Sequence, residues 1–433
     1  MDGNKFQLNK DGTLLFFIIS IHIVCWFAMK PIFPQGDPLV YFINAKRILD
    51  HEYFFSYSVQ SHRYGVFIPQ AIFIKLFGES PYIINLWALL CSLSTLSLIY
   101  IFVLKYINRS VALVTGLLLS VNLVQIIYST VVFPDIIESL FALCCVYFIY
   151  MGRKEKQMWE KNSLLFILCF GLGFTAKESI ILILPFVAFI FWKDWKEEKF
   201  PAFQKSVSVL LILFALFLFT VSKIIINDWM FFYSSFTHYN LYIPLNGFID
   251  LIKHISYKPL LFFNSQLGYV FLFIFSIPAI IDALINRDKF ASIESFISIY
   301  FIILLLSLWC GSISLIHFGY VPMVDRRWMV IITPLCILSA ITIHGIIQST
   351  ISRRTLYFLI GAFLLFGIFN SIEFTIIRGT LFVGFATMLI LQETVRKNIE
   401  NNYWIRVCLI LLPFFILAIQ FLRTNSNYVV TTN

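Results

Sequence analysis

Acidic and basic side chains that interrupt or border the long apolar runs are the candidates for chemistry in this sequence. Asp37 lies between Gly36 and Pro38, soon after the first apolar run ends. A carboxylate at the edge of an apolar region is placed to accept a proton from a hydroxyl group, which is the task of a general base. Asp before Pro is also a common N-cap of a helix, and the two interpretations are compatible.

A second acidic element follows Phe133 and Pro134. Asp135 and Glu138 have the i, i+3 spacing that places both side chains on one face of a helix. Acids at the start of a helix interact favourably with its dipole, which is the simpler interpretation. The alternative is a site facing Asp37 that orients hydroxyl groups or holds a divalent cation such as Mg²⁺ or Mn²⁺. No ligand pattern in the sequence requires a metal.

Arginine residues border apolar runs at two places. Arg63 follows His62, and Arg326 stands next to Arg327 at the start of a late apolar run. The planar donor fork of arginine matches a phosphate group. Positive charge placed against a departing phosphate also stabilises it. Contact with lipid headgroups is the simpler interpretation of each arginine.

Lys177 and Glu178 separate two short apolar runs, 163–176 and 179–192. The simpler interpretation is an ion pair or a contact with lipid headgroups. A charge pair between two short membrane spans more often marks a buried polar site. We therefore include both residues among the site candidates.

The elements that must position these residues are apolar. The chain has 433 residues, of which 60% are hydrophobic and 13% are charged, and the mean hydropathy is +0.86. That share of charge is about half of what a soluble domain carries, which excludes a soluble enzyme. The apolar runs are continuous rather than alternating, which disfavours a β-barrel. The sequence therefore predicts an all-α polytopic membrane protein in which residues 1–433 form a single transmembrane domain.

About thirteen apolar runs are candidate transmembrane helices, and among them are 110–131, 379–395 and 404–422. If the N-terminus is cytoplasmic, more than half of the 32 Lys and Arg residues fall in inside loops, as is typical of membrane proteins. The net charge of +9 then reflects topology rather than nucleic-acid binding. An odd number of spans places the C-terminus outside, and the candidate residues gather at the outer face. The compact loops favour a bacterial inner membrane.

Two of the outside loops are long, namely residues 33–81 and 227–264. Both are rich in aliphatic and aromatic residues, so we expect helices that lie in the plane of the membrane interface. In the first loop, 38–49 and 66–77 are expected to form two such pieces. Ser80 is expected to cap the following helix, with Pro81 in its first turn.

The order of these elements resembles the motifs of GT-C glycosyltransferases. The first loop contains Asp37-x3-Tyr41-x3-Ala45-x2-Ile48, which is similar to the first-loop motif of that superfamily. Later elements continue the resemblance in the same order: Arg63-Tyr64-Gly65, Pro134-Asp135, Ala176-Lys177-Glu178-Ser179, and Arg326-Arg327-Trp328 with Pro334. The group that the chain resembles includes protein O-mannosyltransferases and lipid A aminoarabinose transferases, which use polyprenyl-phosphate sugars. The chain departs from this group at Pro38, where a second acid often follows the aspartate.

The resemblance implies a GT-C fold, about thirteen transmembrane helices and chemistry at the outer membrane face. A polyprenyl-phosphate-linked sugar is the implied donor, and a hydroxyl of a glycan, lipid or protein attacks it with inversion. Asp37 is the implied general base. Four residues are assigned to the donor phosphate: Arg63, Lys177, Arg326 and Arg327. Contacts with the sugar or the acceptor, or with a divalent cation, are assigned to Asp135, Glu138, Glu178, Tyr41 and His62.

Two other functions stay open on the sequence alone: a flippase or transporter of a lipid-linked sugar, and a polysaccharide ligase or polymerase. A transporter is expected to carry charges along a path through the membrane and to show repeated halves. The charges here cluster at one face instead. A ligase or polymerase requires a similar outer site and is separated less clearly. Neither the sugar nor the acceptor can be read from the sequence.

Overall fold

The computed structural model describes residues 8–52, 59–197, 201–227, 267–285, 292–310, 325–348 and 352–373, together with residue 386. The first half contains α1 (Leu8–Ala28), α2 (Asp37–Leu49), α3 (Tyr64–Phe77), α4 (Pro81–Ile84), α5 (Leu86–Tyr106), α6 (Arg109–Ser120), α7 (Leu123–Ser129), α8 (Pro134–Lys154) and α9 (Trp159–Ala176). The second half contains η3 (Glu178–Ile183), α10 (Leu184–Lys196), α11 (Pro201–Ile226), α15 (Leu267–Ile285), α16 (Ile293–Cys310), η5 (Asp325–Ile331), α17 (Ile332–Ile347) and α18 (Arg353–Glu373). The described ranges contain no strand, which confirms the predicted all-α class.

Five of the described helices are long and apolar enough to cross a membrane, and the bent pair α6 and α7 makes up to six. This confirms an integral membrane protein with several spans. The total of about thirteen stays a prediction, because the expected spans 379–395 and 404–422 and the second long loop, 227–264, lie outside the described residues.

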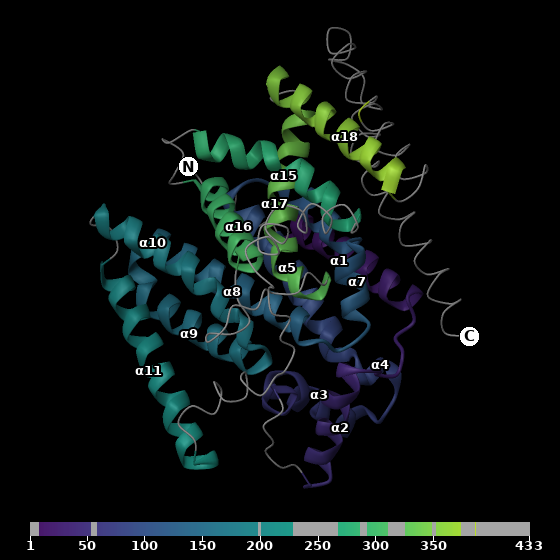
Figure 1. The fold of residues 1–433 in the computed structure, drawn as a ribbon, viewed down its shortest axis with the longest axis vertical. Helices are drawn as coiled ribbons and strands as arrows, with labels where there is room; N and C mark the ends of the chain where they lie inside the picture. The colour runs from purple at the N-terminus through teal and green to yellow at the C-terminus, as the bar shows by residue number, and fades with distance from the viewer. Residues whose placement is uncertain are drawn as a thin grey trace, which may run out of the picture.

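The helices form a bundle whose centre is occupied by α8 and α17. α8 packs against α9 and α5, and α17 packs against α15 and α6. Figure 1 shows α11 at one edge of the bundle and the group α2, α3 and α4 at its lower end. α11 is attached mainly to α9, and most of its apolar length is exposed, as expected for a helix that faces lipid.

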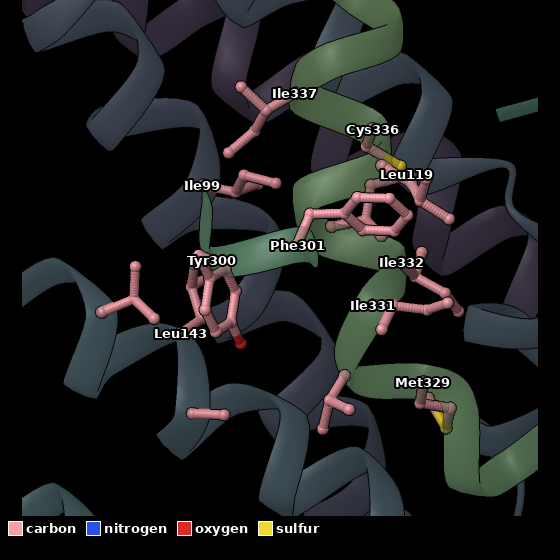
Figure 2. Close-up of a cluster of buried hydrophobic side chains, with 14 of the residues drawn as sticks. Ile99, Leu119, Leu143, Tyr300, Phe301, Met329, Ile331, Ile332, Cys336 and Ile337 are labelled. Atoms are coloured by element: carbon pink, nitrogen blue, oxygen red, sulfur yellow. The ribbon is translucent and has the colours of Figure 1, made fainter. Parts of the chain in front are cut away.

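The core between the central helices is a continuous layer of aliphatic and aromatic side chains (Figure 2). α17 contributes Ile332, Cys336 and Ile337, and η5 contributes Met329 and Ile331. These side chains are fully buried. Burial of these side chains gives close helix packing. It also fixes η5, which carries two of the candidate arginines, to the bundle.

The predicted span 110–131 is broken into α6 and α7, which are bent by 56° relative to each other. Asn122 causes part of the break, because its Oδ1 accepts a hydrogen bond from the backbone N–H of Gln125 at 3.1 Å and caps α7. His22 of α1 satisfies the carbonyl group of Ser120 at the end of α6, with Nδ1 at 2.9 Å. Polar side chains therefore replace the helical hydrogen bonds that the bend removes.

The two helical pieces predicted within residues 33–81 are present as α2 and α3. α3 ends at Gly78, whose φ of 83° suits glycine. The predicted cap is also confirmed, because Ser80 Oγ accepts from the backbone N–H of Ile83 at 3.3 Å and Pro81 begins α4.

Asp37 does not cap α2, so that interpretation was wrong. The N-cap is Gly36, with φ of 63°, and Asp37 is the first residue of the helix with Pro38 behind it. A glycine can enter the helix from this left-handed conformation with little strain. The carboxylate of Asp37 is consequently available for contacts outside α2.

Three ion pairs lie at the end of the bundle that is opposite α2, α3 and α4, among residues expected to be cytoplasmic. Arg109 Nε lies 2.6 Å from Asp11 Oδ1, and Lys105 Nζ lies 2.9 Å from Glu155 Oε1. α8 connects the two ends, since Asp135 stands in its first turn and Arg153 in its last. Arg153 forms a bidentate ion pair with the carboxylate of Asp194 in α10, and both N···O distances are 2.7 Å.

Candidate active site

The most exposed ion pair of the predicted site joins Asp37 to Arg326. Arg326 Nη1 donates a hydrogen bond of 3.0 Å to Asp37 Oδ2. Their side chains are 29% (Arg326) and 38% (Asp37) exposed. The guanidinium of Arg326 also lies over the ring of Phe133, 5.0 Å from its centroid, which is a favourable cation–π contact. The start of α2, the loop before α8 and η5 therefore meet at one place.

Lys177 holds the two acids of α8 together. Its Nζ lies 2.8 Å from Asp135 Oδ1 and 2.8 Å from Glu138 Oε2. Ser179 Oγ donates to the second oxygen of Glu138 at 2.6 Å. The side chains are only 12% (Lys177), 4% (Asp135) and 4% (Glu138) exposed. The helical spacing thus places both acids on one face of α8, as predicted, and that face meets the end of α9.

Arg63 forms a third centre between α2 and η3. It donates one hydrogen bond to the hydroxyl of Tyr41 and another, of 3.3 Å, to Glu178 Oε2. Tyr41 is fully buried on α2. Arg63 precedes the first residue of α3, so its position depends on how α3 packs against α9.

Eight of the ten predicted residues are therefore linked by charge or hydrogen bonds into three neighbouring groups: Asp37 with Arg326, Asp135 and Glu138 with Lys177, and Tyr41 and Glu178 with Arg63. His62 is buried before Arg63, with Nε2 3.5 Å from Ser61 Oγ. Arg327 is half-buried next to Arg326 in η5. We refer to the eight linked residues as the ionic cluster.

Comparisons with known proteins give a family model that matches part of the chain and several solved structures of similar fold. A family model described as dolichyl-phosphate-mannose-protein mannosyltransferase matches residues 64–224, which include Lys177 and both acids of α8. No curated protein sequence matches the chain. The structure is similar to that of ArnT from Cupriavidus metallidurans bound to undecaprenyl phosphate, with a TM-score of 0.62 and 12% sequence identity over 93% of this chain and 75% of ArnT. The chain has the GT-C fold.

Two further solved structures agree with this fold. ArnT in the apo state gives a TM-score of 0.60 at 13% identity, over 93% of this chain and 74% of ArnT. The oligosaccharyltransferase of Archaeoglobus fulgidus, in a complex with Zn and sulfate, gives 0.52 at 12% identity over 91% of this chain. The chain spans only 57% of the length of that oligosaccharyltransferase.

The electrostatics of the ionic cluster differ between its exposed and buried parts. Burial opposes the charge of Lys177, but the carboxylates of Asp135 and Glu138 outweigh it and raise the pKa of Lys177 above its ordinary value. Burial likewise opposes the charge of Arg63, and Glu178 and Tyr41 hold its pKa high. Burial raises the pKa of Tyr41 to about 12. Lys177 and Arg63 are therefore charged, and Tyr41 is neutral, at physiological pH.

The acids of α8 do not fit a divalent cation in this arrangement. Mg²⁺ and Mn²⁺ require several oxygen ligands around one point. The point between Asp135 and Glu138 is taken by the Lys177 ammonium, which contacts both carboxylates at 2.8 Å. The described residues contain no group of three or more His, Cys, Asp or Glu side chains that could hold a metal ion.

Three residues of the site were not found from the sequence. Phe133 supports Arg326 and Ser179 binds Glu138. Tyr300 of α16 lines a cavity of about 10 Å³ together with Glu138 and Ser179, which is close to the space that one water occupies. Phe133 and Ser179 adjoin Pro134 and Glu178 in the sequence, which was the available signal. Tyr300 lies within an apolar run and gave none.

Proposed function

We propose that this chain is an inverting glycosyltransferase that moves a sugar from a polyprenyl-phosphate donor to an acceptor hydroxyl. The observation that carries this proposal is the partly exposed Asp37–Arg326 pair, which accompanies buried acidic and basic side chains in a chain with the GT-C fold. A base and a phosphate-binding cation lie side by side there. The bound undecaprenyl phosphate of ArnT supports a polyprenyl-phosphate donor.

Asp37 is the proposed general base. Arg326 contacts its Oδ2, and we assign Oδ1 to the acceptor hydroxyl. As the acceptor oxygen forms a bond to the anomeric carbon, Asp37 takes the hydroxyl proton, and the bond from that carbon to the phosphate oxygen breaks. The electron pair of the broken bond leaves with polyprenyl phosphate. Attack opposite the leaving group inverts the anomeric centre.

Arg326 and Arg327 are the proposed binders of the leaving phosphate. Arg326 is anchored by Phe133 and Asp37 but keeps 29% of its side chain exposed, so a ligand can reach it. Arg63 is more buried, yet its Nε donor has no hydrogen-bond partner among the described residues. That donor is available to an anion if the site opens. Positive charge fixed at these positions stabilises the negative charge that develops on the phosphate.

In this proposal, Lys177 organises the side chains of the site and does not bind the phosphate directly. Its charge is already balanced by Asp135 and Glu138, and the three side chains are nearly buried. We infer that Lys177 holds the two acids where they orient sugar or acceptor hydroxyls. Glu178, Tyr41 and His62 border the same region and are proposed to shape it.

The proposed orientation places the ionic cluster at the outer face of a bacterial inner membrane, with the N-terminus in the cytoplasm and the C-terminus outside. The ion pairs Arg109–Asp11 and Lys105–Glu155 lie at the end rich in basic loops, which supports this orientation. The charged residues of α8 lie near its two ends, with Asp135 and Glu138 among its first five residues and Arg153 and Lys154 in its last turn. Such a distribution favours chemistry at one face over a charged path through the membrane.

A transfer assay tests the proposal. Purified protein is incubated with a panel of radiolabelled polyprenyl-phosphate sugars, and loss of label from the lipid to an acceptor or to water is followed. We expect release from at least one donor, and Asp37→Asn should abolish it. If the wild type moves intact labelled lipid across liposomes without cleaving it, the protein is a transporter and the proposal fails. Release of label that is unchanged in Asp37→Asn would remove the assignment of the base.

A further inference from the structure

The junction between α4 and α5 lies next to the ionic cluster and takes no part in the proposed chemistry. Asn85 occupies it, between Ile84 at the end of α4 and Leu86 at the start of α5. The residue is fully buried. A buried amide is stable only if its donors and its acceptor find partners, and Asn85 finds them on three separate segments of the chain.

The two donors of Asn85 reach backwards along the chain. Its Nδ2 lies 3.0 Å from the carbonyl oxygen of Ile32 and 2.8 Å from that of Pro81. Ile32 belongs to the non-helical segment 30–36 that leads directly into Asp37. We call residues 30–36 the base-bearing segment. Its ends are bonded to the flanking helices, since Lys30 N–H donates to the Phe27 carbonyl and the Gly36 carbonyl accepts from Leu39 N–H. Between these ends, its position depends on contacts such as that of Ile32 with Asn85.

The acceptor of Asn85 reaches forwards to the loop before α8. Its Oδ1 accepts from the backbone N–H of Val132 at 3.1 Å. Val132 directly precedes Phe133, the ring beneath Arg326, and Pro134, which begins α8. We call residues 130–133 the α8-leading segment. Trp26 of α1 holds the same loop from another side, since its Nε1 donates to the carbonyl oxygen of Ser129 at 2.7 Å.

The same junction also fixes the helix that carries Arg63. Gln70 of α3 donates from Nε2 to the carbonyl oxygen of Ile84 at 3.1 Å. Trp87 of α5 donates from Nε1 to the carbonyl oxygen of Gly65 at 3.0 Å. All three groups of the ionic cluster are thus connected to residues 84–87 by hydrogen bonds between side chains and backbone.

We propose that Asn85 is a positioning residue that holds the base-bearing segment and the α8-leading segment in fixed register. Arg326 contacts Asp37, which directly follows the first segment, and Phe133, which ends the second. A shift between the segments therefore changes the distance from the base to the phosphate-binding cation. Misplacement of a reacting group by about 1 Å can lower a rate about 100-fold. The catalytic consequence rests on the proposed function, whereas the structural link does not.

Hydrogen exchange of the full-length protein in detergent tests the link without any substrate. In Asn85→Ala, the amide of Val132 should exchange about tenfold faster or more, because it loses its acceptor. The hydrogen-bonded amide of Lys30 should also exchange faster, because the Ile32 carbonyl loses its donor and the segment is released. Asn85→Asp keeps the Oδ1 acceptor and loses the donors, so exchange should rise in residues 30–36 and stay near wild type in residues 130–133. Unchanged exchange of both segments in Asn85→Ala overturns the proposal.

Activity measurements then separate positioning from a general loss of stability. Asn85→Ala should lower kcat about tenfold to 100-fold in correctly folded protein. In an Arg326→Ala background, which is expected to keep measurable transfer, Asn85→Ala should cause little further loss of rate, because its effect acts through the distance between Asp37 and Arg326. Additive losses contradict the proposal. If the wild type transfers no sugar, the proposed function fails while the exchange result still decides whether Asn85 holds the segments.

Two further variants serve as references. Asn162→Ala removes another buried asparagine, on α9, and should leave exchange of both segments and the transfer rate unchanged. Trp26→Phe removes the bond to Ser129, keeps the contacts with Asn85 intact and leaves a smaller ring beside Tyr82. If Asn85→Ala does not fold, Trp26→Phe should still loosen residues 130–133 and leave residues 30–36 protected. Equal loosening of both segments by Trp26→Phe counts against a separate role for Asn85.

Discussion

Arg326 donates a hydrogen bond of 3.0 Å to Asp37 across 289 positions of the sequence. The contact joins the start of α2 to η5, which precedes α17. It places the only half-exposed carboxylate of the ionic cluster beside its most exposed arginine. The base and the phosphate-binding group of the proposed reaction are therefore adjacent before any ligand binds.

Asp37→Asn should abolish sugar transfer and leave thermal stability near that of the wild type. The amide keeps the shape of the side chain but cannot take up the acceptor proton. The lost ion pair is partly exposed, so its loss should cost about 1 kcal/mol or less. Release of label and the melting temperature in detergent are the two measurements. Asp50→Asn is the matched control, because Asp50 is exposed at the end of the same helix.

Arg326→Ala should weaken binding of the donor lipid about tenfold or more. A hydrogen bond to a charged group contributes about 1.5–3 kcal/mol, and the alanine variant also leaves Phe133 without its cation. Arg327→Ala should weaken binding as well. Affinity for a polyprenyl phosphate without a sugar can be measured by titration. Wild-type affinity in both variants would falsify the phosphate-binding role.

Lys177→Met should destabilise the protein by about 3–5 kcal/mol, because Asp135 and Glu138 would stay buried without a partner. The folded-state pKa of Lys177 is raised above its ordinary value of 10.5. Its stabilising contribution is thus fully present below pH 10.5 and is lost as pH rises through the folded-state pKa. The difference in melting temperature between the wild type and Lys177→Met should therefore be constant near neutral pH and shrink only in strong alkali.

Asp194→Asn provides a comparison for Lys177→Met. It breaks the buried pair with Arg153 at the opposite end of the bundle, so it should also lower stability. The affinity for donor lipid should stay at the wild-type value in the folded fraction. If Asp194→Asn and Lys177→Met reduce transfer equally per folded molecule, Lys177 has no specific role in the site.

Gly65→Ala should reduce both stability and transfer. An added Cβ would lie 2.9 Å from the backbone nitrogen of Ala176 and 3.2 Å from its Cα. Backbone atoms cannot turn aside, so α3 must move away from the end of α9 at a cost of about 1–3 kcal/mol. That movement separates Arg63 from Glu178. Gly361→Ala is the control, since nothing lies within 4 Å of the added carbon, and it should retain wild-type transfer.

Membership of the site could largely be predicted from the sequence, because charged residues are rare and each interruption of an apolar run is visible. Asp135, Glu138 and Lys177 were found in this way, and they do meet. Local signals also sufficed for α2, α3 and the cap at Ser80. In each of these cases the determining residues lie within one or two helical turns of each other.

The partners within the site could not be predicted. Lys177 was assigned to a phosphate, yet two carboxylates surround it, and the sequence contains no sign of which helix faces α9. The pairing of Asp37 with Arg326 depends on the packing of η5 against α8. The contacts of Asn85 could not be predicted either, because the sequence around an asparagine between two helices does not show whether its side chain binds one segment or three.

α8 carries its acids at one end and its basic residues at the other, and its 21 residues correspond to about 30 Å of helix, close to the thickness of a bilayer core. In the proposed orientation, the groups of the proposed reaction are therefore held at a fixed height above the inner headgroups. In a thicker bilayer they would sink below the plane in which a lipid phosphate resides. Transfer should accordingly be fastest in vesicles whose acyl chains match α8, and it should fall when longer chains are used.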